Sequence, residues 1–281
     1  MIEEQRFGYA GDDGAEIAAY RWSGATAPRA VIQLAHGAGE HALRYLEPLS
    51  PIVEAGFVVY AADHRGHGAT AGSPERLGDF GPGGANAAIA DMAVLSKKIR
   101  ADHPGVPVVL FGHSMGAAFA QVYLTRWHHL IDGLVLSGTA AAWLPRGERR
   151  DPNSAYENPR TPYDWLSRDP DEVDKYVADP LCGIRFTPQS GASFRSVGEQ
   201  AADPAHLTEV RRGLPVYVFV GDEDPINDRL ARVTPLIDRY RDAGLDVTIK
   251  VYPGGRHEML NETNRAEVVA DLKAWLESRY G

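Results

Sequence analysis

The feature that most constrains the fold of this chain is a regular alternation of short apolar runs with longer amphipathic stretches. Six apolar runs are expected to be buried parallel strands: AVIQLA, FVVYAA, VPVVLF, GLVLSG, PVYVFVG and VTIKVY. Amphipathic stretches, expected to be helices, lie between and after them at residues 45–55, 85–100, 115–127, 230–243 and 264–279. Strands and helices that alternate in this way predict an α/β fold with a mostly parallel, doubly wound sheet.

The first 22 residues depart from this alternation. Apolar and polar residues loosely alternate on each side of the turn GDDG at residues 11–14, which is the pattern of two strands joined by a tight turn. We therefore expect an antiparallel hairpin at one edge of the sheet.

A long interval between the fourth and fifth apolar runs contains no clear strand. It is rich in Pro, Asp and Arg, which would suit a disordered segment. It also carries seven aromatic residues, which supply too much apolar surface to stay solvated: Trp143, Tyr156, Tyr163, Trp165, Tyr176, Phe186 and Phe194. The expected organisation is an α/β core at residues 1–139 and 214–281, with a mostly helical cap, or lid, at residues 140–213 folded over the strand ends.

Composition excludes several classes of function. The net charge is −9 and no run of Lys or Arg could follow a phosphate backbone, so we expect no nucleic-acid partner. A single cysteine, Cys182, and an amino-terminal stretch without a basic and apolar leader pattern predict a cytoplasmic location. The apolar runs are far shorter than the roughly 18–20 residues that cross a bilayer. No H-x-x-x-H or C-x-x-C spacing occurs, so neither a metal nor a cofactor is expected.

Ser114 lies between two glycines in GHSMG, where an apolar run ends and a helix-compatible run begins. A helix that directly follows a parallel strand needs a very tight turn, and Gly112 and Gly116 remove the Cβ atoms that would collide there. The pattern G-x-S-x-G in this context is typical of a nucleophile elbow, and it predicts Ser114 as a catalytic nucleophile. The alternative is a chance meeting of glycines and a serine.

A serine nucleophile needs a base and an orienting acid, which in this fold follow it in the order acid, then histidine, at strand ends. Of the four histidines after Ser114, His257 follows the last apolar run through the loop PGGR and is the predicted base. The acid should emerge from GDEDP after the preceding run. Asp224 is the preferred candidate, Asp222 remains an alternative, and the three clustered carboxylates of this loop could also be ordinary loop solvation.

Two backbone N–H groups should stabilise the developing oxyanion. One belongs to Met115, the residue after the nucleophile, and the other is expected from the loop HGAGEH after the first apolar run, at Ala38. An ordinary glycine turn is the alternative for this loop. The polar residues of DHRGHG, namely Asp63, His64 and His67, are expected to form a turn network that supports the HGAG loop.

The motifs HGAGEHALRY, DHRGHG, GHSMG, GDED and HEMLNE resemble the monoacylglycerol lipase and lysophospholipase group of serine α/β-hydrolases. The resemblance runs from His36 to Glu262, but inside the cap it covers only YVADPL at residues 176–181. The chain departs from the group at Ala117, where Gly is usual, and at Thr70, where Ser is usual. The resemblance implies an α/β-hydrolase fold. It also implies the same catalytic assignments: Ser114, Asp224 and His257, with Ala38 and Met115 as oxyanion donors.

The expected activity is therefore hydrolysis of a carboxylic ester through an acyl-enzyme on Ser114, with a small-molecule ester or lipid as substrate. Monoacylglycerol or a lysophospholipid-type ester comes first. The charged cap sequences RGERRDP and RDPDEVDK would keep the cap surface wet, so a general carboxylesterase is the alternative, with at most peripheral membrane contact through the cap. Amide or peptide hydrolysis and a non-catalytic ligand receptor are the less favoured alternatives.

Overall fold

The computed structural model describes residues 1–24, 27–144 and 151–281. Eight strands form one sheet in the order β1-β2-β4-β3-β5-β6-β7-β8. The bounds of the strands are β1 Glu3–Ala10, β2 Glu16–Ser23, β3 Val31–Ala35, β4 Val58–Ala62, β5 Val108–His113, β6 Gly133–Ser137, β7 Pro215–Gly221 and β8 Asp246–Tyr252. Strands β3 to β8 are parallel, whereas β1 and β2 form an antiparallel hairpin at the edge, so the predicted α/β sheet and its hairpin are confirmed.

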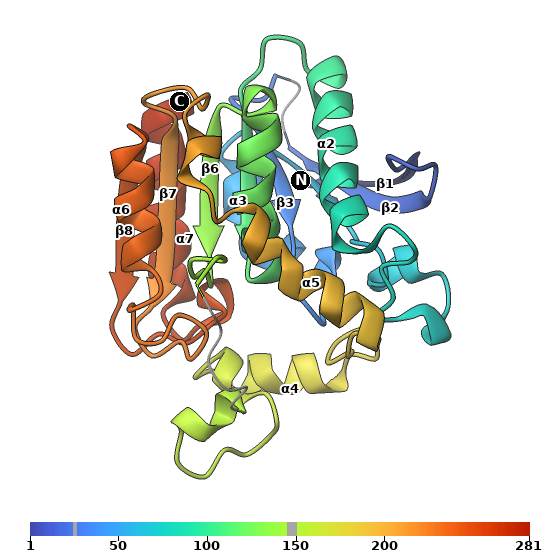
Figure 1. Ribbon diagram of the computed structural model, residues 1–281, viewed down its shortest axis with the longest axis vertical. Coiled ribbons are helices and arrows are strands. Elements are labelled where there is room, and N and C mark those ends of the chain that lie inside the picture. The colour runs from blue at the N-terminus through green and yellow to red at the C-terminus, as the bar shows by residue number, and fades with distance from the viewer. Residues whose placement is uncertain (25–26, 145–150) are drawn as a thin grey trace.

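Helices cover both faces of the sheet because the parallel strands are apolar on both sides. One face packs against α2 (Gly84–Asp102), α3 (Met115–Trp127) and α6 (Thr234–Asp242). The other packs against α1 (Leu46–Glu54) and α7 (Arg265–Tyr280). Figure 1 shows α2 and α3 in front of the sheet. None of the described helices is long and apolar enough to cross a membrane.

The helix predicted at residues 230–243 is shorter than expected, and this prediction was wrong at its start. The helix α6 begins at Thr234, because the preceding turn carries three consecutive residues with positive φ, namely Asp228, Arg229 and Leu230. A residue in the left-handed region cannot continue a right-handed helix. Pro235 then occupies the first turn of α6, a position that tolerates its missing N–H.

The segment between β6 and β7 contains the helices α4 (Pro170–Ala178) and α5 (Pro188–Gln200), with short 3₁₀ helices at Pro152–Ala155, Asp164–Leu166 and Pro204–Leu207. The Asp169 carboxylate caps α4 by accepting a hydrogen bond from the Asp171 N–H. In Figure 1 α4 lies beyond the carboxyl ends of the strands, and α5 packs against α2 and α3. Residues 145–150, which include the first five residues of the charged stretch RGERRDP, lie outside the described residues.

Candidate active site

Ser114 occupies the sharp turn between β5 and α3. Its backbone has a φ of 53° and a ψ of −112°, a strained combination for a residue other than glycine. A Cβ on Gly112 would lie 2.5 Å from the Gly116 carbonyl oxygen, and one on Gly116 would lie 2.0 Å from the carbonyl oxygen of Ala35. Both glycines are therefore required by the close approach of β3, β5 and α3, which leaves the Ser114 side chain at the carboxyl edge of the sheet.

Three side chains from distant segments form a continuous hydrogen-bonded chain at this edge. Ser114 Oγ lies 2.8 Å from His257 Nε2, and His257 Nδ1 lies 2.9 Å from Asp224 Oδ2. A carboxylate can only accept, so the imidazole carries its proton on Nδ1 and presents the lone pair of Nε2 to the serine hydroxyl. The structure thus brings together the serine, histidine and aspartate that sequence order selects, each after the end of a strand.

The environment of His257 favours a basic imidazole. Burial by itself lowers the pKa of His257, but the charge of Asp224 and its hydrogen bond raise it more, so the net pKa lies above the ordinary value. The imidazole is only 2% exposed and the Asp224 carboxylate is fully buried. A general base becomes positively charged when it takes a proton. The buried Asp224 carboxylate stabilises that charged form of the imidazole.

The other carboxylates of the loop after β7 have different partners. Asp222 accepts a hydrogen bond from the Gly254 N–H at 2.6 Å and so holds the turn that precedes His257. Glu223 is exposed and lies 4.0 Å from Arg229. Asn227 is fully buried and bonds the Gly221 carbonyl and the Leu230 N–H, which fixes the course of the loop around Asp224. The geometry therefore favours Asp224 over the alternative Asp222.

The loop after β3 lies beside Ser114, as a Cβ on Gly37 would be 3.1 Å from the Cβ of Ser114. The buried Glu40 carboxylate accepts hydrogen bonds from the Gly37 N–H and the Tyr45 hydroxyl, which closes the loop on itself. Among the described residues, no protein acceptor faces the N–H of Ala38 or of Met115. Both N–H groups are therefore free of an internal hydrogen-bond acceptor.

A buried ion cluster joins this loop to the loop of His257, and sequence reasoning did not identify it. The guanidinium of Arg44 lies between Glu40 and Glu258 and holds Glu258 through two bonds of 2.8 and 2.7 Å. Burial raises the pKa of Glu40, whereas at Glu258 the Arg44 charge outweighs burial and lowers the pKa. Both glutamates lie inside quoted motifs, but nothing in their spacing indicates that they share one arginine.

The segment between β6 and β7 contacts both loops. The ring of Trp165 packs on the His257 imidazole at 4.9 Å between centroids, and the Glu258 N–H donates to the Leu166 carbonyl at 2.8 Å. The Tyr176 hydroxyl donates to the Gly39 carbonyl at 2.7 Å. Sequence reasoning named Trp165 and Tyr176 as apolar surface, and Tyr176 also as part of YVADPL, but it did not identify their partners, which lie far away along the chain.

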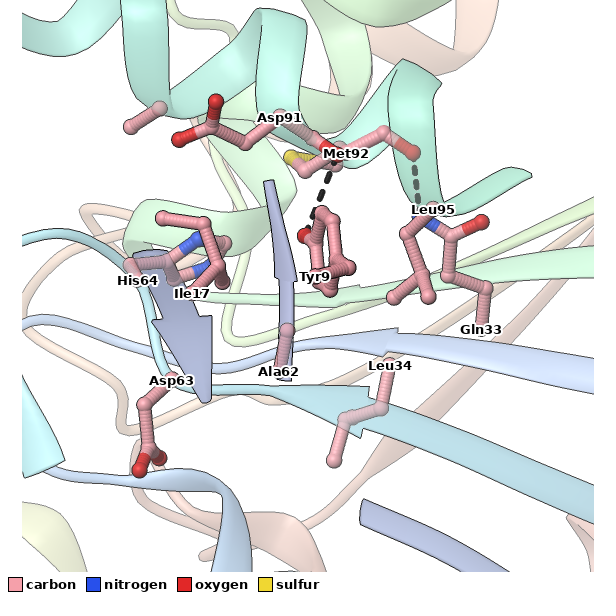
Figure 2. A pocket seen from close by; sticks show the side chains of 11 residues that line it. Tyr9, Ile17, Gln33, Leu34, Ala62, Asp63, His64, Asp91, Met92 and Leu95 are labelled. Atoms are coloured by element: carbon pink, nitrogen blue, oxygen red, sulfur yellow. Dashed lines mark hydrogen bonds between the residues drawn. The ribbon is translucent and has the colours of Figure 1, made fainter. Parts of the chain in front are cut away.

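The DHRGHG residues pack beneath the loop after β3. The Asp63 carboxylate accepts hydrogen bonds from the Ala42 N–H and the Tyr20 hydroxyl, and the His64 N–H donates to His36 Nε2. The predicted supporting network is therefore confirmed for Asp63. His64 contributes its backbone N–H and His67 bonds the Arg65 carbonyl through Nδ1, but among the described residues neither Nε2 atom has a hydrogen-bond partner. Figure 2 shows His64 and Asp63 lining a cavity of about 10 Å³, which has room for about one water molecule and contains none of the three residues Ser114, Asp224 and His257.

Comparisons with known proteins agree with this geometry. A profile of the family described as serine aminopeptidase, S33, matches residues 26–264. A monoacylglycerol lipase of Mycolicibacterium smegmatis is 33% identical over 96% of this chain and 96% of its own length. A monoglyceride lipase homolog of monkeypox virus is 28% identical over 92% of this chain and 93% of its own length.

The solved structures give the same relationship. A thermostable carboxyl esterase from Bacillus coagulans, in complex with glycerol, superimposes with a TM-score of 0.88 at 30% identity and covers 98% of both chains. The predicted resemblance to the monoacylglycerol lipase group and the α/β-hydrolase fold is confirmed. Because the family profile matches most of its length, the chain belongs to the serine aminopeptidase S33 family of serine α/β-hydrolases.

Proposed function

We propose that this protein is a serine hydrolase of carboxylic esters, with monoacylglycerol or a similar lipid ester as its substrate and Ser114 as its nucleophile. The observation that carries the proposal is the chain of contacts from Ser114 through His257 to Asp224, with bonds of 2.8 and 2.9 Å. The relative from Mycolicibacterium smegmatis is named a monoacylglycerol lipase and that of monkeypox virus a monoglyceride lipase homolog, and this supports the choice of substrate.

In the proposed reaction His257 Nε2 takes the hydroxyl proton of Ser114 as Oγ bonds to the ester carbonyl carbon. Asp224 holds the proton on Nδ1 and stabilises the imidazolium. The imidazolium then returns its proton to the leaving alcohol oxygen, and the C–O bond to that alcohol breaks. Water, deprotonated by the same imidazole, attacks the acyl-enzyme, and collapse of the second intermediate releases the acid and restores Ser114.

The carbonyl oxygen becomes negative in both steps, and we assign its stabilisation to the N–H groups of Ala38 and Met115. Met115 begins α3, so its N–H points out of the amino end of the helix, where negative charge is favoured. Ala38 lies in the loop that Glu40 and Tyr176 hold from two sides. Each well-placed donor of this kind is worth about 10²–10³ in rate.

We assign residues 140–213 as the cap that covers the substrate site and residues 1–139 and 214–281 as the catalytic core. Support comes from the contact of the Trp165 ring with His257 and from the hydrogen bond of the Tyr176 hydroxyl to the Gly39 carbonyl. We further propose that the protein is cytoplasmic, that it contacts membranes at most peripherally, and that it binds no nucleic acid.

A general carboxylesterase remains the second candidate because of the surface of α4. This helix buries Val173 and Tyr176, while its charged side chains Asp174 and Lys175 are 56% and 60% exposed. Such a surface does not favour insertion into a bilayer, and a dissolved ester would reach the site without it. The similar carboxyl esterase described above is in keeping with this alternative.

The test is a hydrolysis profile from acetate to palmitate esters, each as a p-nitrophenyl ester and as a monoacylglycerol, with an anilide added as an amide substrate. Ser114→Ala should lose nearly all turnover, although about 10³–10⁴ over water can persist without the nucleophile. Ser50→Ala is the matched control, because its hydroxyl only bonds the Glu47 carbonyl on the surface of α1. Unchanged turnover in Ser114→Ala would reject the mechanism, and preference for short acyl chains or for the anilide would reject the lipid substrate.

A further inference from the structure

A second cluster of reactive side chains lies at the junction between the cap and the loop after β3. It consists of His41, Asp179 and Cys182, whose ligand atoms all lie within 4.8 Å of one another. His41 follows the HGAG loop, whereas Asp179 and Cys182 come from the turn after α4. His41 is 7% exposed and the other two are half-buried, so the cluster is shielded but accessible. None of the three is part of the proposed reaction.

The chemistry of this cluster matches that of a zinc site. Imidazole nitrogen, carboxylate oxygen and thiolate sulfur are the three ligand types that Zn²⁺ takes in proteins, at about 2.0–2.3 Å. In a tetrahedron with such bonds the ligand atoms are roughly 3.3–3.6 Å apart. His41 Nε2 and Asp179 Oδ2 are now 2.8 Å apart, so a metal would separate them by about half an ångström.

The charges around the cluster favour a cation. Burial raises the pKa of the Cys182 thiol; of the charged groups that act on it, Arg44 lowers the pKa, whereas Asp179, Glu40 and Glu258 raise it. Arg44 already forms ion pairs with both glutamates. With the three carboxylates ionised, the groups named here sum to a negative charge, which lowers the cost of bringing a divalent ion to the junction.

We propose that His41, Asp179 and Cys182 form a binding site for a divalent transition metal of the zinc class. On binding, the Cys182 thiol releases its proton to solvent and the sulfur bonds to the metal. His41 Nε2 now donates its proton to the Asp179 carboxylate. On metal binding Nε2 releases this proton to solvent, and the neutral imidazole carries its single proton on Nδ1, so that the Nε2 lone pair bonds the metal. The Asp179 oxygen exchanges its bond to His41 for one to the metal, a water keeps the fourth position, and nothing is oxidised or reduced.

A metal here would tie together two segments that already meet. Among the described residues, the Tyr176 hydroxyl and the Gly183 N–H both donate to the Gly39 carbonyl, at 2.7 and 2.9 Å. Metal bonds from His41 to Asp179 and Cys182 would add a stronger link between the same two segments. The expected absence of a metal rested on spacings within one short motif, and such spacings cannot detect ligands separated by 138 residues along the chain.

The sequence makes a direct test possible, because Cys182 is its sole cysteine. Untagged full-length protein is titrated with Co²⁺ under reducing conditions, and the near-ultraviolet spectrum is followed for thiolate-to-cobalt charge transfer. Any such band must come from Cys182. We expect the band, with the visible absorption of tetrahedral cobalt, to saturate at one equivalent and to disappear when Zn²⁺ is added. A titration without the band, at concentrations where Zn²⁺ binds, would overturn the proposal.

Variants separate this site from surface histidines. Cys182→Ser and Asp179→Asn should each weaken Zn²⁺ binding by at least about 100-fold in calorimetry, because each removes a direct ligand. Even the loss of a residue that only hydrogen-bonds a ligand lowers metal affinity by about 10–100-fold. His129→Gln is the control, because His129 is exposed beside His128 and is a plausible adventitious ligand. A change below threefold in Cys182→Ser, or loss of Zn²⁺ binding in His129→Gln, would assign the metal to the surface and refute the site. Thermal unfolding without metal checks that each variant folds.

Discussion

Four buried histidines should make the fold unusually sensitive to mild acid. Burial lowers the pKa of His36, His67 and His113 to about 3 each, and it lowers that of His64 well below the ordinary value. All four are at most 5% exposed. In the unfolded chain each would titrate near 6.5. The unfolded state therefore binds more protons from about pH 6.5 down to about pH 3, so stability is complete above that window and falls as the pH drops through it.

The magnitude follows from linkage. Between pH 7.5 and pH 5.5 one such histidine loses somewhat more than about 1 kcal/mol of stability, and the four together lose about 5 kcal/mol, set against a typical total of 5–15 kcal/mol. His257 opposes this loss, because its raised pKa makes its contribution grow as the pH falls. Most carboxylates titrate below pH 5.5 and add little within this range.

The assay is urea unfolding at three pH values between about 7.5 and 5.5, followed by circular dichroism and by tryptophan fluorescence. His67→Gln should reduce the pH-dependent loss of stability by about 1 kcal/mol, although it lowers the stability at neutral pH because the bond from Nδ1 to the Arg65 carbonyl is disturbed. The exposed His129→Gln should leave the slope unchanged. A total loss below about 1 kcal/mol, or an unaltered slope in His67→Gln, would refute the reasoning.

Three further outcomes are expected. Asp224→Asn should lower kcat by roughly 10⁴-fold, because it removes the acceptor that fixes the imidazole tautomer, whereas Asp222→Asn should lower kcat by less than about tenfold. A larger loss of kcat in Asp222→Asn than in Asp224→Asn, measured in ester assays, would reassign the acid. The kcat/KM profile should rise with pH through an ionisation above 6.5, since the raised pKa of His257 must be exceeded to free Nε2, and an ionisation below 6 would contradict this. Gly116→Ala should abolish folded, active protein, because its Cβ would lie 2.0 Å from the Ala35 carbonyl, and a fully active variant would disprove that constraint.

The sequence was sufficient to predict the sheet and the partners of Ser114. The sheet depends on local apolar runs, and the partners depend on the order of the catalytic residues along the chain. Buried parallel strands are apolar runs of limited length, and the tight turn at Gly112 and Gly116 requires glycine for steric reasons. Strand order then left few histidines after Ser114, and His257 lies within hydrogen-bond distance of it.

Other parts of the site depend on contacts between segments that are far apart in the sequence. The spacing of apolar residues along the chain does not predict such contacts. Arg44 and Glu258 are 214 positions apart, and Trp165 contacts His257 only because of how the segment after β6 packs. The late start of α6 has a local cause, but positive φ at Leu230 is unusual for a bulky residue and cannot be expected from its type.

The contacts of the segment at residues 164–183 limit how these enzymes can diversify. Trp165 and Tyr176 meet His257 and Gly39, while the Arg168 guanidinium bonds the fully buried Glu262, whose carboxylate also receives the Arg256 N–H. Replacing the whole segment between β6 and β7 by that of another enzyme would remove these contacts. A productive graft should therefore retain residues 164–183 and exchange the flanking parts. Substitutions in those flanking parts would change the substrate range without removing the contacts with His257, Gly39 and Glu262.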